Sequence, residues 1–237
     1  MTFDLSKIKI YADGADIKQI KELLDNPLVS GFTTNPTLMR AAGVNNYEHF
    51  AKQLLDIVEE KPVSLEVFSD DFQEMYEQAL TISSWGSNVY IKIPVTNTKG
   101  ESSSELIKNL VSNGIKVNVT AVMTRAQIIE ICKVLNNNVP SNISIFAGRI
   151  ADTGREPAEF FTYAKENLKN NLNCKLIWAS PREILNVIQA ISVGCEIITI
   201  TPNLLSKINL LGYSLEDYSR DTVEMFFKDA LLSGYII

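Results

Sequence analysis

The stretch Asn88-Val89-Tyr90-Ile91-Lys92-Ile93-Pro94-Val95-Thr96 alternates between apolar and other residues. Its β-branched side chains fall on every second position from Val89 to Ile93, which predicts a β-strand with one apolar face. Pro94 lacks the N–H that a sheet requires, so it indicates that the strand is ending. Lys92 is therefore predicted on the other face of an apolar strand, near its carboxyl end.

Lys92 has two interpretations. Burial disfavours the charged ammonium, so a buried lysine offers a free amine that can attack a carbonyl carbon. Alternatively, the aliphatic stem packs against its neighbours while the tip reaches water. The stretch by itself does not decide between them, and the rest of the chain has to.

Short apolar runs rich in β-branched residues recur along the chain, at 8–13, 29–34, 63–68, 89–95, 115–121, 143–147, 176–179 and 196–200. Each is followed by a helical pattern, at 17–24, 37–42 with 47–58, 72–82, 105–111, 128–135, 158–168, 184–191 and 204–210. Eight strand–helix units predict an α/β protein, with residues 1–237 forming a single (β/α)8 TIM barrel domain. The alternative is a doubly wound open sheet. No glycine-rich phosphate loop follows a strand, which argues against a nucleotide site.

The C-terminal segment 214–237 is expected to add a helical tail. Within it, residues 215–232 form an amphipathic pattern whose apolar side carries Tyr218, Val223, Phe226, Phe227 and Leu231. This side suits either a lid over the site or a contact between subunits, and the sequence does not choose between them. We expect a homo-oligomer.

Composition restricts the partners. The net charge is −6 and the chain has no basic run, which argues against nucleic acid and anionic membrane surfaces. No apolar run reaches membrane-spanning length, and the first residues lack the pattern of a signal peptide. The three scattered cysteines, Cys132, Cys174 and Cys195, are expected as reduced thiols in a cytoplasmic protein. One histidine, His49, excludes histidine-rich metal sites, and we expect no metal and no other cofactor.

Polar or charged side chains stand at or near the carboxyl end of each expected strand. In strand order they are Asp13; Thr33, Thr34 and Asn35; Glu66; Lys92; Asn118 and Thr120; Ser144 and Arg149; Ser180 and Arg182; Thr199 and Thr201. Chemistry in a (β/α)8 barrel is built at this end. Singly, each has an ordinary alternative: Asp13 or Asn35 can cap a helix, and Arg149 can form a surface ion pair.

Together these side chains match one kind of chemistry. An amine nucleophile with two carboxylates, and without metal ligands, suits Schiff-base formation followed by carbon–carbon bond cleavage or formation. The arginines come from the later strands, where barrels often bind phosphate. The predicted substrate is therefore a sugar phosphate.

Four blocks of the sequence resemble the transaldolase family, in the same order and over nearly the whole chain. They are Gly31-Phe32-Thr33-Thr34-Asn35-Pro36-Thr37, Ile91-Lys92-Ile93-Pro94, Gly114-Ile115-Lys116-Val117-Asn118-Val119-Thr120 and Phe146-Ala147-Gly148-Arg149. The length is similar to that of the small transaldolases and the related fructose-6-phosphate aldolases. The resemblance implies a barrel enzyme that forms a Schiff base without a metal.

The resemblance also implies roles for residues at the matching positions. Lys92 would be the Schiff-base lysine, and Asp13 would take and return the proton of the substrate hydroxyl at the cleaved bond. Glu66 and Thr120 would hold a water used in proton transfer. Asn35 would hydrogen-bond the dihydroxyacetone unit.

The remaining substrate-binding candidates follow from the same blocks and strand ends. Ser144 and Arg149 would bind the substrate phosphate. The other expected contacts are Thr34, Asn118, Phe146, Ser180 and Arg182.

Two positions bear on the branch of the family. Glu66 with Phe146 is similar to the transaldolase pattern, whereas the aldolase branch tends to carry glutamine and tyrosine there. The sequence departs from the family after strand seven, where Ala179-Ser180 runs directly into Pro181-Arg182. We therefore expect any difference in substrate at its phosphate end.

The predicted function is transfer of a dihydroxyacetone unit from a ketose phosphate to an aldose phosphate through a Lys92 Schiff base. One alternative is an aldolase that releases free dihydroxyacetone, or one that acts on a specialised sugar. Another is a barrel that has lost activity and serves as a binding protein or scaffold.

Overall fold

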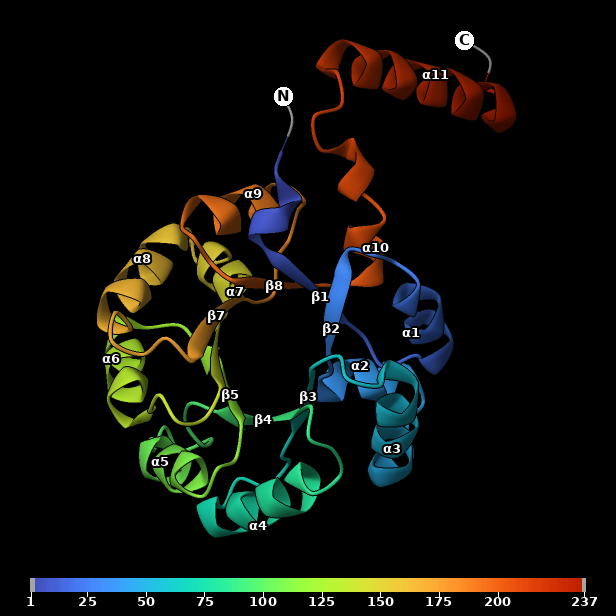
Figure 1. Cartoon of the computed structure of the whole chain (residues 1–237). Coiled ribbons are helices and arrows are strands. Elements are labelled where there is room, and N and C mark those ends of the chain that lie inside the picture. The colour runs from blue at the N-terminus through green and yellow to red at the C-terminus, as the bar shows by residue number, and fades with distance from the viewer. Residues whose placement is uncertain (1–2, 236–237) are drawn as a thin grey trace.

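The computed structural model describes residues 3–235, so positions 1–2 and 236–237 of the predicted domain and tail lie outside the described residues. Eight parallel strands close into a barrel in the order of the chain, with helices around the outside (Figure 1). The strands are β1 Lys9–Asp13, β2 Val29–Thr33, β3 Val63–Glu66, β4 Val89–Pro94, β5 Val117–Val122, β6 Ser141–Ile145, β7 Cys174–Trp178 and β8 Ile197–Ile200. The predicted (β/α)8 fold is confirmed, and the doubly wound open sheet was wrong.

The helices follow the strands as the repeated pattern predicts. They are α1 Ile17–Leu24, α2 Pro36–Ala41, α3 Tyr47–Val58, α4 Phe72–Ser83, α5 Ser104–Ser112, α6 Arg125–Val134, α7 Ala147–Ala151, α8 Ala158–Asn167, α9 Leu185–Ser192, α10 Pro202–Leu205 and α11 Leu215–Ser233, with short 3₁₀ turns η1 Leu5–Lys7 and η2 Ile208–Leu210. Most bounds agree with the predicted ones to within a few residues. The segment 204–210 was expected as one helix, but it divides into α10 and η2.

Strand β4 has the alternation that its sequence predicts. Val89, Ile91 and Ile93 are buried, whereas Tyr90, Lys92 and Pro94 are partly exposed. Because neighbouring side chains of a strand point to opposite faces, the apolar set packs toward the helices and the other set enters the barrel. The strand ends at Pro94, as expected.

The connection after β6 differs from the prediction. Residues 143–147 were expected as strand, but β6 ends at Ile145, and α7 begins at Ala147. The apolar run continues across this boundary because the start of α7 is as deeply buried as the strand, so hydrophobicity does not distinguish them. Arg149 consequently lies on a helix rather than at a strand end.

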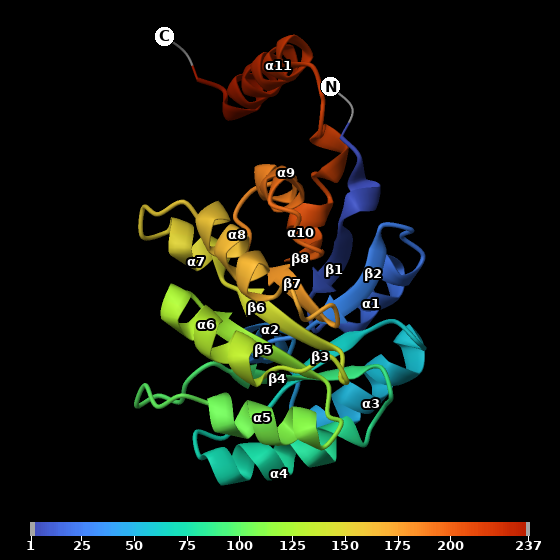
Figure 2. The ribbon, with the colours of Figure 1, turned by 60° about the vertical axis from the view of Figure 1, so that its left-hand side comes forward.

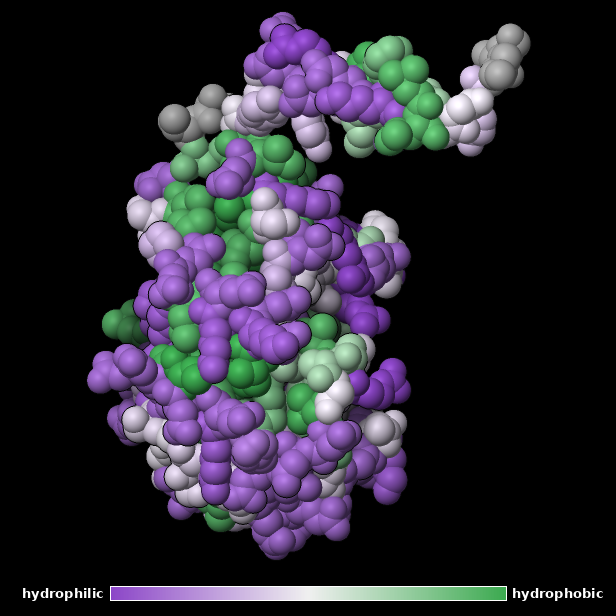
Figure 3. Space-filling model, turned by 90° about the vertical axis from the view of Figure 1, so that its right-hand side faces the viewer, coloured by the Kyte–Doolittle hydropathy of each residue, from purple (hydrophilic) through white to green (hydrophobic). Residues whose placement is uncertain are grey.

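Helix α11 stands away from the barrel. Figure 1 shows it outside the ring of helices rather than across the barrel opening, and Figure 2 shows the same separation from the side. None of its residues is buried, and its large apolar side chains include Phe226 at 62% and Phe227 at 63% exposed. Figure 3 shows hydrophobic surface gathered on part of this helix. Among residues 3–235, no helix has both the length and the apolar character needed to cross a bilayer.

Candidate active site

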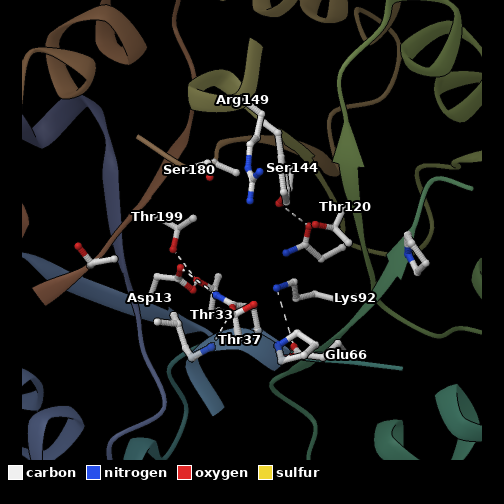
Figure 4. A pocket seen from close by; sticks show the side chains of 18 of the residues that line it. Asp13, Thr33, Thr37, Glu66, Lys92, Thr120, Ser144, Arg149, Ser180 and Thr199 are labelled. Carbon is white, nitrogen blue, oxygen red and sulfur yellow. Dashed lines mark hydrogen bonds and ion pairs between the residues drawn. The ribbon is translucent and has the colours of Figure 1, made fainter. Parts of the chain in front are cut away.

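A cavity of about 510 Å³ opens at the carboxyl ends of the strands, around Lys92 (Figure 4). Ten of the predicted site residues line it: Asp13, Asn35, Glu66, Lys92, Asn118, Thr120, Ser144, Phe146, Arg149 and Ser180. Thr34 and Arg182 were also predicted, but they are not among the lining residues. In Figure 4, Asp13 and Lys92 face each other across the cavity.

Lys92 and Glu66 are paired on neighbouring strands. They occupy matching positions of β4 and β3, so both side chains enter the barrel at the same level. The Lys92 Nζ lies 3.8 Å from Glu66 Oε2, and it also donates a hydrogen bond to the backbone carbonyl of Thr34. Only 12% of the Lys92 side chain is exposed. The amine is thus held inside the ring, with its tip facing the cavity.

Glu66 is a buried carboxyl with one oxygen occupied. The Thr34 hydroxyl donates to Glu66 Oε2 at 2.9 Å, which places Thr34 behind the cavity as a support for Glu66. Glu66 Oε1 is buried and has no hydrogen-bond partner among residues 3–235. Burial raises the pKa of Glu66, and the charge of Lys92 opposes this only in part. A buried acid with an unused oxygen is suited to binding a water or a substrate hydroxyl.

Asp13 is held at both oxygens. The Thr33 hydroxyl donates to Asp13 Oδ1 at 2.8 Å, and Asn35 Nδ2 donates to Oδ2 at 3.3 Å. Burial raises the pKa of Asp13, against the opposing effects of Lys92 and these two donors. Asn35 does cap a helix, since its Oδ1 accepts from the Leu38 N–H at the start of α2. The same amide therefore anchors α2 and orients Asp13.

Thr120 lies within an irregular part of β5. The pairing with β6 shifts between Val119 and Val122, and Ala121 has a φ of 61°. An extra residue of this kind redirects the neighbouring side chains of a strand. Thr120 lines the cavity on the side of Lys92, as Figure 4 shows.

The floor of the cavity is a chain of buried hydrogen bonds. Ser144 Oγ donates to Asn118 Oδ1 at 2.7 Å, and Asn118 Nδ2 donates to Ser64 Oγ at 3.0 Å. All three side chains are almost completely buried. Because buried polar groups need partners, the chain fixes the orientation of the Asn118 amide under Lys92.

The two predicted arginines are placed differently. Arg149, on α7, lines the cavity and points into it. Arg182 forms an ion pair with Asp152 through two of its nitrogens, and these hydrogen bonds lower the pKa of Asp152. In this conformation, Arg149 is the arginine available to an anion in the cavity.

Ser180 lies in a strained turn beside α7. Its φ is 60°, a left-handed conformation that is uncommon for residues other than glycine. A Cβ on Gly148 would lie 1.7 Å from the Ser180 carbonyl oxygen, so only glycine fits at this contact. The close approach brings Ser180 to the cavity wall.

Sequence reasoning did not select several residues that the structure places here. Thr33 and Thr199 share a hydrogen bond beside Asp13, Ser64 supports Asn118, and Thr37 and Thr201 line the cavity. Thr33, Thr199 and Thr201 were recognised only as residues at the ends of β2 and β8, with no role in the site. The signal that could have found Ser64 and Thr199 is the alternation, since both lie on strand positions that face the barrel.

The assembled groups are a buried amine, two buried carboxyls, several hydroxyls and a guanidinium. An amine with a neighbouring acid can form an imine with a carbonyl compound, and a second carboxyl can move a proton on the substrate. Within residues 3–235, no three histidine, cysteine or acidic side chains come together as a metal-binding cluster.

Comparisons with known proteins identify the family of the chain. Residues 10–230 match the sequence model of the family "Transaldolase/Fructose-6-phosphate aldolase". The chain is 33% identical to "Probable transaldolase 2" of Listeria monocytogenes, over 94% of this chain and 95% of that protein. It is 31% identical to "Probable transaldolase" of Nitrosopumilus maritimus, over 90% and 94% of the two chains.

Similar solved structures share the barrel. An aldolase named QR15 has a TM-score of 0.54 at 17% identity, covering 89% of this chain and all of that one. A 2,3-dimethylmalate lyase has a TM-score of 0.56 at 13% identity, covering 92% and 86%. At these identities the structural likeness shows the fold alone, whereas the sequence matches extend over almost the entire chain. The chain therefore belongs to the transaldolase/fructose-6-phosphate aldolase family.

Proposed function

We propose that this protein is a transaldolase that carries a three-carbon dihydroxyacetone unit on Lys92. The Lys92 amine adds to the C2 carbonyl of a ketose phosphate such as fructose 6-phosphate. The resulting carbinolamine loses water to give a protonated imine. Glu66 and Thr120 hold a water that passes a proton to the hydroxyl of the carbinolamine, so that this hydroxyl departs as water.

Cleavage then uses the carboxyl on the opposite side of the cavity. Asp13 takes the proton from the C4 hydroxyl, and the C3–C4 bond breaks as its electrons move into the imine. An aldose phosphate leaves, and the three-carbon enamine stays on Lys92. The enamine attacks the aldehyde of an acceptor such as erythrose 4-phosphate, Asp13 returns the proton, and water releases the new ketose.

The observation that carries this proposal is the position of Lys92. Its amine is enclosed by the barrel, 3.8 Å from Glu66 Oε2, and it faces Asp13 across the cavity. Arg149 provides the positive charge for a phosphate, and charge-assisted contacts of this type are strong. Ser144 would bind the phosphate together with Arg149, and Asn118 and Asn35 are the hydrogen-bonding groups that would contact the sugar.

Borohydride reduction tests the imine. Treatment with fructose 6-phosphate and borohydride should add the mass of the reduced three-carbon unit to the peptide that contains Lys92. Lys92→Met should abolish both the adduct and turnover. Lys116→Met is the matched control, because Lys116 precedes β5 at the opposite end of the barrel and should leave both unchanged. An unmodified Lys92 during turnover would contradict the proposal.

The second candidate is an aldolase that releases free dihydroxyacetone. The presence of Phe146 at the cavity argues for transfer, because phenylalanine has no hydroxyl with which to orient the water that hydrolyses the enzyme-bound intermediate. An assay with and without an aldose phosphate acceptor separates the two. A transaldolase turns over only with the acceptor, and an aldolase turns over without it.

A further inference from the structure

Thr199 meets Thr33 in the barrel interior beside Asp13. The two hydroxyl oxygens are 2.5 Å apart, and Thr33 is 3% and Thr199 7% exposed. They come from β2 and β8, the two strands that flank β1. The contact therefore joins the strands on either side of the one that carries Asp13, as Figure 4 shows.

The direction of these hydrogen bonds follows from the number of protons. A hydroxyl has one proton to donate, and an ionised carboxylate can only accept. Thr33 donates its proton to Asp13 Oδ1, so Thr199 must be the donor to Thr33. The order of donation is Thr199 to Thr33 to Asp13.

The contact with Thr33 depends on the hydroxyl of Thr199 and not on the shape of its side chain. Valine has the same branched shape as threonine, and burying a hydroxyl is unfavourable unless it is bonded. Hydrogen bonds in a chain polarise one another, so a donor behind Thr33 makes Thr33 a better donor to Asp13.

We propose that Thr199 is a positioning residue, which holds the Thr33 hydroxyl directed at Asp13 and so keeps Asp13 oriented and ionised for proton transfer. The inference deepens the proposed function and rests on it, since it concerns the group that would take the C4 hydroxyl proton. Thr199 acts through Thr33 and needs no contact with the reacting atoms.

Other charged groups also act on Asp13. Lys92 on β4 favours the ionised form of Asp13, and the charge of Asp13 in turn raises the pKa of Glu66 on β3. Arg149 on α7 lines the same cavity. Because none of these is altered by a change at Thr199, they form a constant background for the test.

The first test needs no substrate. In a ¹³C NMR titration of the aspartate carboxyls, Thr199→Val should raise the pKa of Asp13, because the donor to Asp13 is weakened. Thr199→Ser keeps the hydroxyl and should titrate like the wild type, and Thr33→Val should shift Asp13 in the same direction and further. An Asp13 titration that is unchanged in Thr199→Val would overturn the inference, and so would an equal shift in Thr199→Ser, which would indicate that the methyl group matters instead.

The second test uses the reaction. Thr199→Val should lower kcat by about 5- to 10-fold, the usual effect of one hydrogen bond, with little change in KM. The acid limb of kcat/KM should move to higher pH, and Thr199→Ser should restore both. Wild-type kinetics in Thr199→Val would overturn the inference.

The two proposals fail separately. If borohydride traps no adduct on wild-type Lys92 but the titration of Asp13 shifts as described, the reaction is wrong while the role of Thr199 stands. If the adduct forms and the Asp13 titration does not move, the role of Thr199 is wrong and the reaction stands.

Discussion

Glu66 and Lys92 stand opposite each other on β3 and β4, with the lysine nitrogen 3.8 Å from Glu66 Oε2 and the second carboxyl oxygen of Glu66 left without a partner among residues 3–235. The pairing follows from the register of two parallel strands, so it is set by the backbone and not by flexible loops. The unused oxygen points to an additional group, such as a water, that completes the site. In the reaction proposed above, the fate of such a water would decide between transfer and release of the three-carbon unit.

The first prediction concerns this partition. The double variant Glu66→Gln with Phe146→Tyr should raise the fraction of product released as free dihydroxyacetone, because the tyrosine hydroxyl can orient the hydrolytic water. The ratio of free dihydroxyacetone to transferred product measures it. Phe146→Leu with Glu66→Gln is the control, since it changes the same positions without adding a hydroxyl. An unchanged ratio in the double variant would count against the assignment to the transaldolase branch.

The second prediction concerns stability and pH. Burial raises the pKa of Asp13 above its ordinary 3.8, so the folded protein holds this proton more tightly than the unfolded chain. Protonated Asp13 therefore stabilises the folded wild type at low pH. This contribution to the free energy of unfolding is lost as the pH rises above 3.8 and passes the raised pKa of the folded state. Asp13→Asn removes that loss, so its free energy of unfolding relative to the wild type should increase between pH 4 and pH 7.

Asp70 provides a control of opposite sign. Hydrogen bonds from Thr98 lower the pKa of this exposed carboxyl, so it contributes stability that is lost as pH falls. The relative stability of Asp70→Asn should therefore decrease as pH rises. Urea unfolding at several pH values measures both slopes, and slopes of the same sign would refute the argument.

The third prediction separates the two arginines. Arg149→Gln should lower kcat/KM for sugar phosphates by about 30- to 150-fold, since a charge-assisted phosphate contact contributes about 2–3 kcal/mol. Arg182→Gln should have a much smaller effect, because Arg182 is already engaged with Asp152. Steady-state kinetics with phosphorylated and unphosphorylated ketoses measures both. Equal losses would mean that Arg182 leaves Asp152 and reaches the substrate.

The fourth prediction concerns assembly. The exposed apolar side chains of α11 are suited to covering by a second copy of the chain, so we expect a homo-oligomer that depends on them. Phe226→Glu with Phe227→Glu should lower the molar mass measured by light scattering. The barrel should stay folded by circular dichroism. Leu172→Glu alters a residue that is 87% exposed on the barrel, and it should leave the molar mass unchanged.

The sequence predicted most of the barrel because periodicity and burial agree there. The alternation from Val89 to Ile93 indicated both the strand and the direction of Lys92, and the pairing with Glu66 follows once neighbouring strands are in register. The start of α7 was missed because buried strand and buried helix are equally apolar. Two side-chain pairs in and beside the cavity depend on contacts between segments that are distant in the sequence. The pairing of Arg182 with Asp152 spans 30 residues and that of Thr33 with Thr199 spans 166, and no local pattern reports either.

Gly148 has a consequence for attempts to change what this cavity accepts. The wall between β6 and β7 consists here of main chain against main chain, with no space for even a methyl group between Gly148 and Ser180. A larger side chain at Gly148 will therefore force the two backbone segments apart and disrupt this wall, and it will not simply change the shape of the cavity. A change in the number of residues in the turn after Ala179 would instead move the backbone of this wall itself.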